Sequence, residues 1–325
     1  MSAYLWIMSA GSALIFALYG LRCAKAVRRP ELHTHAWRTA LLSFVFAVLF
    51  GTVLGRIGYA VLTQELDFEY DGIEALAYLL DFVEFGTPHV SFFCAAVGVC
   101  LGVLLANRLT RKDTVFAGMD AFAPFGALLA AMFRLGELFF KIYGLGRTLP
   151  ENSPLAFFPF AVRLTDAGGY ESWRWAVCVL SALFALVCAA VAFFRLRSRG
   201  RTGFSFSAAL FFLALPQILC ESLRTTGIMW LFVHAEQLLC AVVLLFVMLF
   251  WILKSGKGLP FPRRWWPLGA LLLGVGLLVA VEFAIDGKIF NFRLSVSYII
   301  MCAVLAGIGF AGAAAAKRWN REETR

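Results

Sequence analysis

The chain has 325 residues, of which 61% are hydrophobic and only 15% are charged. This balance excludes an ordinary soluble domain, in which about a quarter of the residues are charged. The net charge of +9 would suggest a nucleic-acid partner in a soluble chain, but here the basic residues lie between long apolar runs. We therefore interpret the chain as an integral membrane protein without a nucleic-acid partner.

Nine apolar runs are each close to the roughly 20 residues that a helix needs to cross a bilayer. They are Tyr4–Leu21, Thr39–Leu62, Thr87–Ala106, Val115–Phe133, Trp175–Phe194, Phe204–Cys220, Ile228–Leu253, Trp265–Ala284 and Leu294–Ala316. The sequence therefore predicts an all-α fold, a polytopic membrane bundle of about nine transmembrane helices. The first run has no basic segment before it, so we expect a retained helix and not a cleaved signal peptide.

The charges in the connections predict the topology. Connections that follow odd-numbered runs hold 20 of the 29 lysines and arginines. The connection after the second run carries seven acidic residues between Glu65 and Glu84 and no basic residue. By the positive-inside rule, the N-terminus lies outside and the C-terminus is cytoplasmic. Two connections are long enough for local structure: Asp71–Phe85 for a short interfacial helix, and Leu155–Val162 for a segment that dips into the headgroups.

An arginine within the fourth run is the first candidate for a functional residue. No charge separates Asp120 from Arg134, so the guanidinium is set into one end of an apolar helix. An arginine costs ~2.5–3.5 kcal/mol at the bilayer centre on insertion scales, so it should face protein or a water-filled cavity. The structural alternative is an interfacial arginine that snorkels to the headgroups. For Asp120, near the other end of the run, we expect a structural role as the partner of a helix or loop.

The predicted topology gathers polar residues in the outer half of the membrane. Gln217, Glu221 and Arg224 have i, i+4 and i+7 spacing and share one helix face. The other members come from the outer ends of the second, third, fourth and seventh runs: Arg56, Tyr59, His89, Ser91, Arg134, Glu137, His234, Glu236 and Gln237. Arginines beside carboxylates suit a phosphate ester headgroup, because a guanidinium binds phosphate oxygens in a bidentate way. The alternative is an ion-pair network that only holds helices together.

The eight cysteines lie mostly inside apolar runs, without CxxC pairs or His/Cys clusters. We expect buried thiols that behave as small hydrophobic residues, with no disulfide framework and no metal site.

Several short motifs, in order and at the predicted helix ends, resemble the prolipoprotein diacylglyceryl transferases. They are Gly55-Arg56-Ile57-Gly58-Tyr59, Asp120 with Ala123-Pro124 and then Arg134-Leu135-Gly136, Glu221 through Arg224, and Glu236-Gln237. The resemblance covers roughly Met1–Leu253. We therefore divide the chain into a seven-helix transferase-like core, residues 1–255, and an additional C-terminal two-helix hairpin, residues 256–325.

The resemblance implies a multi-pass enzyme of the bacterial plasma (inner) membrane. It would move the diacylglyceryl group of phosphatidylglycerol, or of another anionic phospholipid, onto the lipobox cysteine thiol at a prolipoprotein signal peptide, without a cofactor. The substrate-binding residues would be Arg56, Tyr59, Arg134, Gln217, Arg224 and Gln237. The base that deprotonates the thiol would be one of Glu137, Glu221, His89 and His234.

The chain departs from the family pattern at three places. Phe93-Cys94-Ala95 stands where the family has a His-Gly-Gly turn, Glu137 replaces an asparagine, and Gln217 replaces an arginine. Two interpretations follow: a divergent transferase with a substitute base, or a catalytically degenerate scaffold that binds lipid, a lipoprotein or another membrane partner. A transporter would have broken helices at corresponding positions of two halves, and the sequence has no such pairing.

Overall fold

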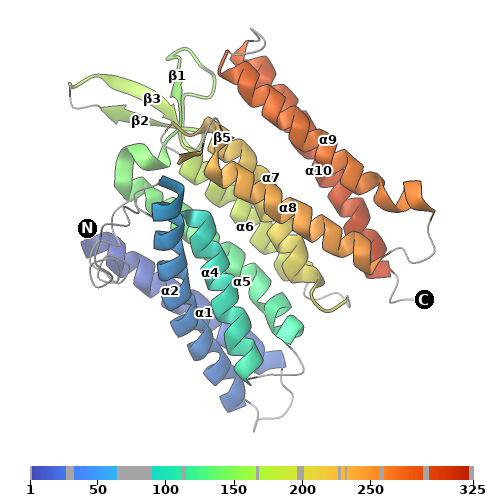
Figure 1. The fold of residues 1–325 in the computed structure, drawn as a ribbon. Coiled ribbons are helices and arrows are strands. Elements are labelled where there is room, and N and C mark those ends of the chain that lie inside the picture. Colours follow the sequence, from blue (N-terminus) through green and yellow to red (C-terminus); the bar gives the residue numbers. More distant parts are fainter. Residues whose placement is uncertain are drawn as a thin grey trace.

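The computed structural model describes residues 2–26, 33–63, 90–110, 115–165, 168–195, 201–225, 228–230, 233–255, 260–287 and 293–321. Within these ranges, nine helices are long and apolar enough to cross a membrane. They lie side by side in one bundle, with a small sheet at one end (Figure 1). The predicted all-α polytopic membrane fold is confirmed.

The helices of the described ranges are α1 (Ser2–Ala26), α2 (His33–Thr63), α4 (Phe92–Thr110), α5 (Val115–Gly136), α6 (Val177–Arg195), α7 (Phe204–Leu223), α8 (Ala235–Lys254), α9 (Phe261–Ile285) and α10 (Leu294–Arg321). A 3-10 helix, η3 (Glu137–Gly144), continues directly from α5. The strands are β1 (Thr148–Leu149), β2 (Ala161–Thr165), β3 (Glu171–Trp175), β4 (Met229–Trp230) and β5 (Val233–His234).

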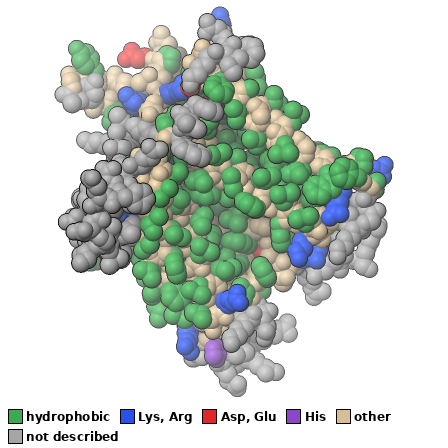
Figure 2. Space-filling view, viewed as in Figure 1, with side chains coloured by type: hydrophobic (Ala, Val, Ile, Leu, Met, Phe, Trp, Pro, Cys, Tyr) green, Lys and Arg blue, Asp and Glu red, His purple; other side chains and the backbone are tan. Residues whose placement is uncertain are grey.

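The outer surface of the bundle is apolar. Large side chains such as Leu273, Ile299 and Phe246 are each about two-thirds exposed, and hydrophobic side chains cover the middle of the visible face (Figure 2). Such a surface is stable in lipid, where a helix satisfies all of its backbone hydrogen bonds internally. The protein is therefore a multi-pass membrane protein.

Glycines allow α2 and α4 to pack at very short range. A Cβ added at Gly98 would lie 2.2 Å from the carbonyl oxygen of Phe50, and one at Gly102 would lie 2.6 Å from that of Phe46. Small residues permit this close approach of the two backbones. Inside a membrane no hydrophobic effect drives helices together, so close van der Waals packing of this kind holds them in contact. The helices α2 and α4 are thus tightly packed against each other on one side of the bundle.

The last two helices are packed into the bundle. α9 and α10 share a continuous apolar cluster with α7 and α8, centred on Phe211, Trp251, Leu271 and Met301. Trp251 also donates a 3.0 Å hydrogen bond to the Ser207 hydroxyl.

Asp120 joins α5 to the beginning of α7. Its carboxylate accepts hydrogen bonds from the backbone N–H groups of Gly203 at 2.6 Å and Phe206 at 2.8 Å. The first N–H groups of a helix have no partner within the helix, so a carboxylate there satisfies them. The predicted structural role of Asp120 is confirmed.

Three predicted helix starts are wrong. The helix predicted to begin at Thr39 begins at His33. The helix predicted to begin at Ile228 begins at Ala235, and the residues before it form the antiparallel pair β4–β5. The run predicted from Thr87 is helical from Phe92; Thr87–His89 lie outside the described residues, as does the predicted interfacial helix Asp71–Phe85.

The connection between α5 and α6 contains a three-stranded antiparallel sheet, in the order β1–β3–β2, that the sequence analysis did not predict. Within Leu155–Val162, the last two residues belong to β2, whereas Phe157 and Phe158 lie in turns and are 49% and 66% exposed. Their insertion into the headgroups stays a prediction.

Candidate functional site

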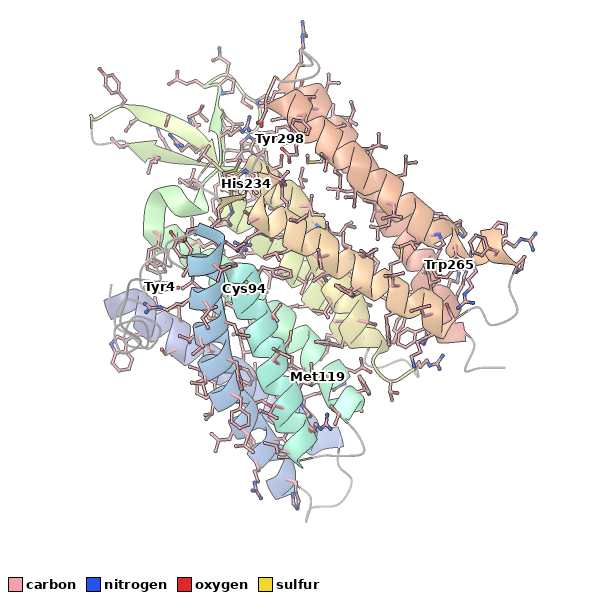
Figure 3. The ribbon with its side chains drawn as sticks, in the orientation of Figure 1. Tyr4, Cys94, Met119, His234, Trp265 and Tyr298 are labelled. Atoms are coloured by element: carbon pink, nitrogen blue, oxygen red, sulfur yellow. The ribbon has the colours of Figure 1, made fainter. Side chains whose placement is uncertain are left out.

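The polar cluster that contains Arg134, Glu221 and Glu236 lies at the end of the bundle that carries the sheet. The end of α5, the end of α7, and the beginnings of α4 and α8 all lie there. In Figure 3, Cys94 of α4 and His234 are near this end, and Met119 of α5 is near the other. These four helix ends thus lie together at one end of the bundle, as the sequence predicted, and their position on the outer side of the membrane stays a prediction.

Arg134 is the centre of the site. Only 2% of it is exposed. Its Nη1 lies 2.5 Å from Glu137 Oε1, and its Nη2 lies 3.2 Å from Glu221 Oε1. Nη2 also lies 3.3 Å from Glu236 Oε2. The guanidinium sits over the Phe92 ring, 3.7 Å from its centroid, in a cation–π contact. The side chain points into the protein, so the snorkelling alternative is wrong.

Arg224 is the second buried guanidinium and follows the last residue of α7. Its Nη2 donates a 2.6 Å hydrogen bond to Glu137 Oε2, and its Nε forms a 3.0 Å ion pair with Glu221 Oε1. Burial opposes the charged form, but Glu137 and Glu221 outweigh it and raise the pKa of Arg224 above its usual range. The residue therefore stays protonated at every physiological pH.

The backbone at Arg224 is held by the connection that follows η3. Arg147 N–H donates a 3.1 Å hydrogen bond to the Leu223 carbonyl, and Gly146 forms an isolated bridge with Arg224. The sheet and the end of α7 are thereby joined beside the site.

The predicted helix face of α7 is confirmed for Gln217 and Glu221, whereas Arg224 follows the last helical residue with an extended backbone. Gln217 Nε2 donates a 2.7 Å hydrogen bond to Glu221 Oε1, one turn further along the helix. Glu221 therefore interacts with Gln217, Arg134 and Arg224 together. Glu221 thus joins its own helix to both arginines of the site.

Glu236 is the third carboxylate of the site. Its Oε1 accepts hydrogen bonds from the Ser91 hydroxyl at 3.2 Å and from Phe93 N–H at 3.3 Å. Glu236 was predicted to belong to the outer polar cluster, but not to act in catalysis or bind substrate. The sequence feature that could have identified Glu236 as a site residue is its position, because it is an acidic residue at the end of an apolar run.

A cavity of about 1240 Å³ extends from this cluster along the bundle. Six polar residues line it at the cluster: Arg134, Glu137, Gln217, Glu221, Arg224 and Glu236. Towards the other end its wall is apolar, with Phe44, Met119 and Phe206. From Arg134 to Met119, α5 rises about 22 Å. The cavity is thus long and apolar with a charged end, the shape and polarity that a phospholipid requires.

The other predicted site residues have different positions. Tyr59 lines the cavity. Arg56 is buried with 2% exposed, but it is not among the residues that line the cavity. Of the three residues expected to share one cavity, Arg134 and Glu221 do so and Arg56 does not.

Gln237 and His234 lie beside the cavity wall, outside it. Gln237 Nε2 donates hydrogen bonds to the Ile218 carbonyl at 3.1 Å and to Glu282 of α9 at 2.7 Å. His234 precedes α8, and burial lowers its pKa despite the nearby Glu282 carboxylate. Its imidazole is therefore neutral near pH 7. His89 lies outside the described residues.

Comparison with known families decides the classification. The family model for prolipoprotein diacylglyceryl transferase matches residues 3–253. The chain belongs to this family. Members of this transferase family act on lipid and prolipoprotein substrates. No curated protein matches the chain. The match ends at residue 253, so α9 and α10 of this diacylglyceryl transferase family member lie outside it.

Proposed function

We propose that the protein transfers the diacylglyceryl group of phosphatidylglycerol to the lipobox cysteine thiol of a prolipoprotein signal peptide, in a bacterial plasma membrane. The observation that carries this proposal is the cluster of two arginines and three glutamates at one end of the long apolar cavity. The apolar part has room for acyl chains, and the cluster holds the groups that a phosphate and a thiol require.

In the proposed reaction, the thiolate sulfur attacks the terminal glyceryl carbon that carries the phosphate. A carbon–sulfur bond forms, the carbon–oxygen bond to phosphate breaks, and glycerol phosphate leaves. The phosphate changes from a singly charged diester to a monoester with additional negative charge. Arg134 and Arg224 would stabilise that developing charge, since buried guanidinium groups need no solvent reorganisation. The thiol proton goes to a carboxylate of the site.

Glu137 is the carboxylate that best fits the role of base. Its side chain is 20% exposed, compared with 3% for Glu221 and 10% for Glu236. It also lines the cavity. A peptide thiol has a pKa of about 8.5, so a positioned base accelerates formation of the thiolate. His234 is supported less well, because it does not line the cavity.

Binding of the lipid phosphate requires an exchange of partners. Each arginine contacts at least two carboxylates, and Glu137 bridges both arginines. A phosphate that takes over one guanidinium would release Glu137, the least buried of the three glutamates. The same exchange would free this carboxylate to accept the thiol proton, which couples lipid binding to base activation.

The charge distribution supports an outward-facing site. Basic residues of the opposite helix ends, such as Arg38, Arg108 and Arg201, belong to connections after odd-numbered helices. By the positive-inside rule those ends are cytoplasmic, so the cluster lies in the outer half of the membrane. A prolipoprotein cysteine arrives on that side when its signal peptide is exported.

A lipid-binding scaffold without transfer chemistry is the second candidate. The specific observation in its favour is that Arg134 and Arg224 are matched by three carboxylates, as in an ion-pair network that joins helices. The two candidates predict the same cavity but different products.

The test is a transfer assay with the purified full chain in nanodiscs that contain radiolabelled phosphatidylglycerol. A lipobox peptide is the acceptor, and the same peptide with serine in place of cysteine is the control. Label on the cysteine peptide alone supports the transferase. Lipid that co-purifies with the protein, without label on either peptide, supports the scaffold.

A further inference from the structure

The helices α9 and α10 touch the site segments at three polar points. These helices lie outside the family match, and they pack against α7 and α8, which carry Glu221 and Glu236. In Figure 1 the end of α9 and the beginning of α10 lie at the same end of the bundle as the sheet. The contacts at this end are polar, whereas the cluster that α9 and α10 share with α7 and α8 is apolar. At the opposite end, Asn320 Oδ1 of α10 accepts a 3.1 Å hydrogen bond from Arg201 N–H.

The first contact fixes the beginning of α8. Gln237 is 4% exposed and follows Glu236 directly. Its Nε2 donates to the Ile218 carbonyl of α7 and to Glu282 Oε1 of α9, at 3.1 and 2.7 Å. Only the amide nitrogen can serve two acceptors, so the orientation of the side chain is determined. Glu282 thereby holds the residue next to Glu236 against α7.

The second contact fixes the end of α7. Tyr298 Oη of α10 donates a 3.2 Å hydrogen bond to the carbonyl of Ser222, the residue after Glu221. The last four carbonyls of a helix have no partner within it, so the tyrosine satisfies an otherwise unpaired acceptor. This bond restrains the turn that carries Glu221 and leads to Arg224.

The third contact reaches the same turn through the loop after η3. Arg147 Nη2 lies 3.9 Å from Asp286 Oδ1 after α9, with both side chains about a third exposed. The Arg147 backbone in turn bonds to Leu223. Exposed pairs of this kind contribute little free energy, so Glu282 and Tyr298 are the stronger supports.

We infer that Glu282 and Tyr298 are positioning residues of the site, which hold Glu236 and the Glu221–Arg224 turn at their distances from Arg134. The inference rests on the proposed function for its kinetic readout. The Arg134 contacts to Glu221 and Glu236 are the longer ones of the guanidinium, at 3.2 and 3.3 Å, so they depend on how α7 and α8 are held. A displacement of about 1 Å at such a site lowers turnover up to about a hundredfold.

The test compares Glu282→Ala, Glu282→Gln and Tyr298→Phe in the full chain in phosphatidylglycerol nanodiscs. Glu282→Gln keeps an oxygen that accepts from Gln237, whereas Glu282→Ala does not. The matched controls are Glu151→Ala and Tyr170→Phe, which change exposed residues. We expect Glu282→Ala and Tyr298→Phe to lower kcat about tenfold to a hundredfold with little change in KM. Glu282→Gln and both controls should stay near wild type.

Hydrogen exchange provides a readout that does not need turnover. In Glu282→Ala, the amides of residues 217–224 and 233–240 should exchange about tenfold faster, while those of α5 do not change. If the wild type has no transfer activity, the proposed function fails and the exchange result alone decides the inference. Unchanged exchange in both Glu282→Ala and Tyr298→Phe overturns it. Faster exchange in a variant that keeps the wild-type kcat also overturns the inference. An equal loss of kcat in Glu282→Ala and Glu282→Gln overturns it as well.

Discussion

Glu137 accepts a hydrogen bond from Arg224, 87 residues further along the chain, at 2.6 Å. The other oxygen of the same carboxylate lies 2.5 Å from Arg134. One partly exposed glutamate therefore bridges the two buried cations of the site. In the proposed reaction, this bridge opens when a phosphate displaces Glu137 from a guanidinium, and its opening releases the base.

Glu137→Gln tests the bridge. The amide keeps the size of the side chain but cannot take the thiol proton, so we expect kcat to fall by about 10²–10⁴-fold. The loss of a competing negative charge should at the same time tighten binding of phosphatidylglycerol. Single-turnover kinetics and lipid titration in detergent measure the two effects, with Glu151→Gln as the exposed control. Unchanged kcat would assign the base to another residue.

Arg134→Met tests the electrostatic balance of the cluster. The substitution leaves three buried carboxylates with one fewer cation, and an uncompensated buried charge costs about 3–5 kcal/mol. We expect a loss of this size in the free energy of unfolding, measured by denaturant titration in mixed micelles. Arg163→Met removes the partner of Glu171 in an exposed pair on the sheet and should change stability by at most about 1 kcal/mol. Equal effects of the two substitutions would show that the buried cluster is not a charge network.

Ala130→Phe tests the path of the acyl chains. Ala130 lines the cavity one turn before Arg134, so a phenyl ring there would fill the space next to the cluster. We expect the kcat/KM for phosphatidylglycerol to fall at least about tenfold, because a steric block removes binding energy from the whole lipid. Ala190→Phe, on the exposed side of α6, is the control. If both variants turn over lipid like the wild type, the acyl chains do not pass Ala130 in the cavity.

His234 gives the protein a predicted dependence of stability on pH. Burial lowers its pKa in the folded protein below the usual 6.5, so the unfolded chain takes up the proton first as pH falls. This contribution to stability is therefore present above pH 6.5 and is lost as the pH falls below that value. Thermal unfolding of wild type and His234→Gln between about pH 8 and 5 tests it. The wild type should lose more stability than the variant over this range, and parallel curves would contradict the assignment.

The nine helices and much of the site could be predicted because lipid imposes strong constraints on a sequence. An apolar run long enough to cross the bilayer by itself is expected to be a helix, and a charge within it is expected to face protein. The spacing of Gln217 and Glu221 placed them on one helix face, and the predicted role of Asp120 followed from its position near the end of a run.

The beginning of α8 could not be predicted from hydropathy. The residues Ile228–Val233 are as apolar as the helix that follows, and periodicity alone does not separate a short apolar strand from a helix. The sheet between α5 and α6 was missed for a related reason, since its strands are short and β1 has two residues.

Contacts between helices that are far apart in the sequence could not be predicted either. Gln237 was expected to bind substrate, but its amide donates to α7 and to Glu282 of α9. Arg56 was expected in the same cavity as Arg134 because both lie at outer helix ends, yet it is buried and is not among the residues that line the cavity. Depth in the membrane follows from topology, whereas the direction of a side chain depends on packing.

The most direct test of the account is single-turnover diacylglyceryl transfer by Arg134→Lys in phosphatidylglycerol nanodiscs. Lysine keeps the positive charge but loses the planar fork that can hold two phosphate oxygens. We predict that transfer by Arg134→Lys is about 10²–10³-fold slower than by wild type, while Arg163→Lys, on the exposed sheet, is unaffected. Transfer by Arg134→Lys within about threefold of wild type would contradict the central role of Arg134.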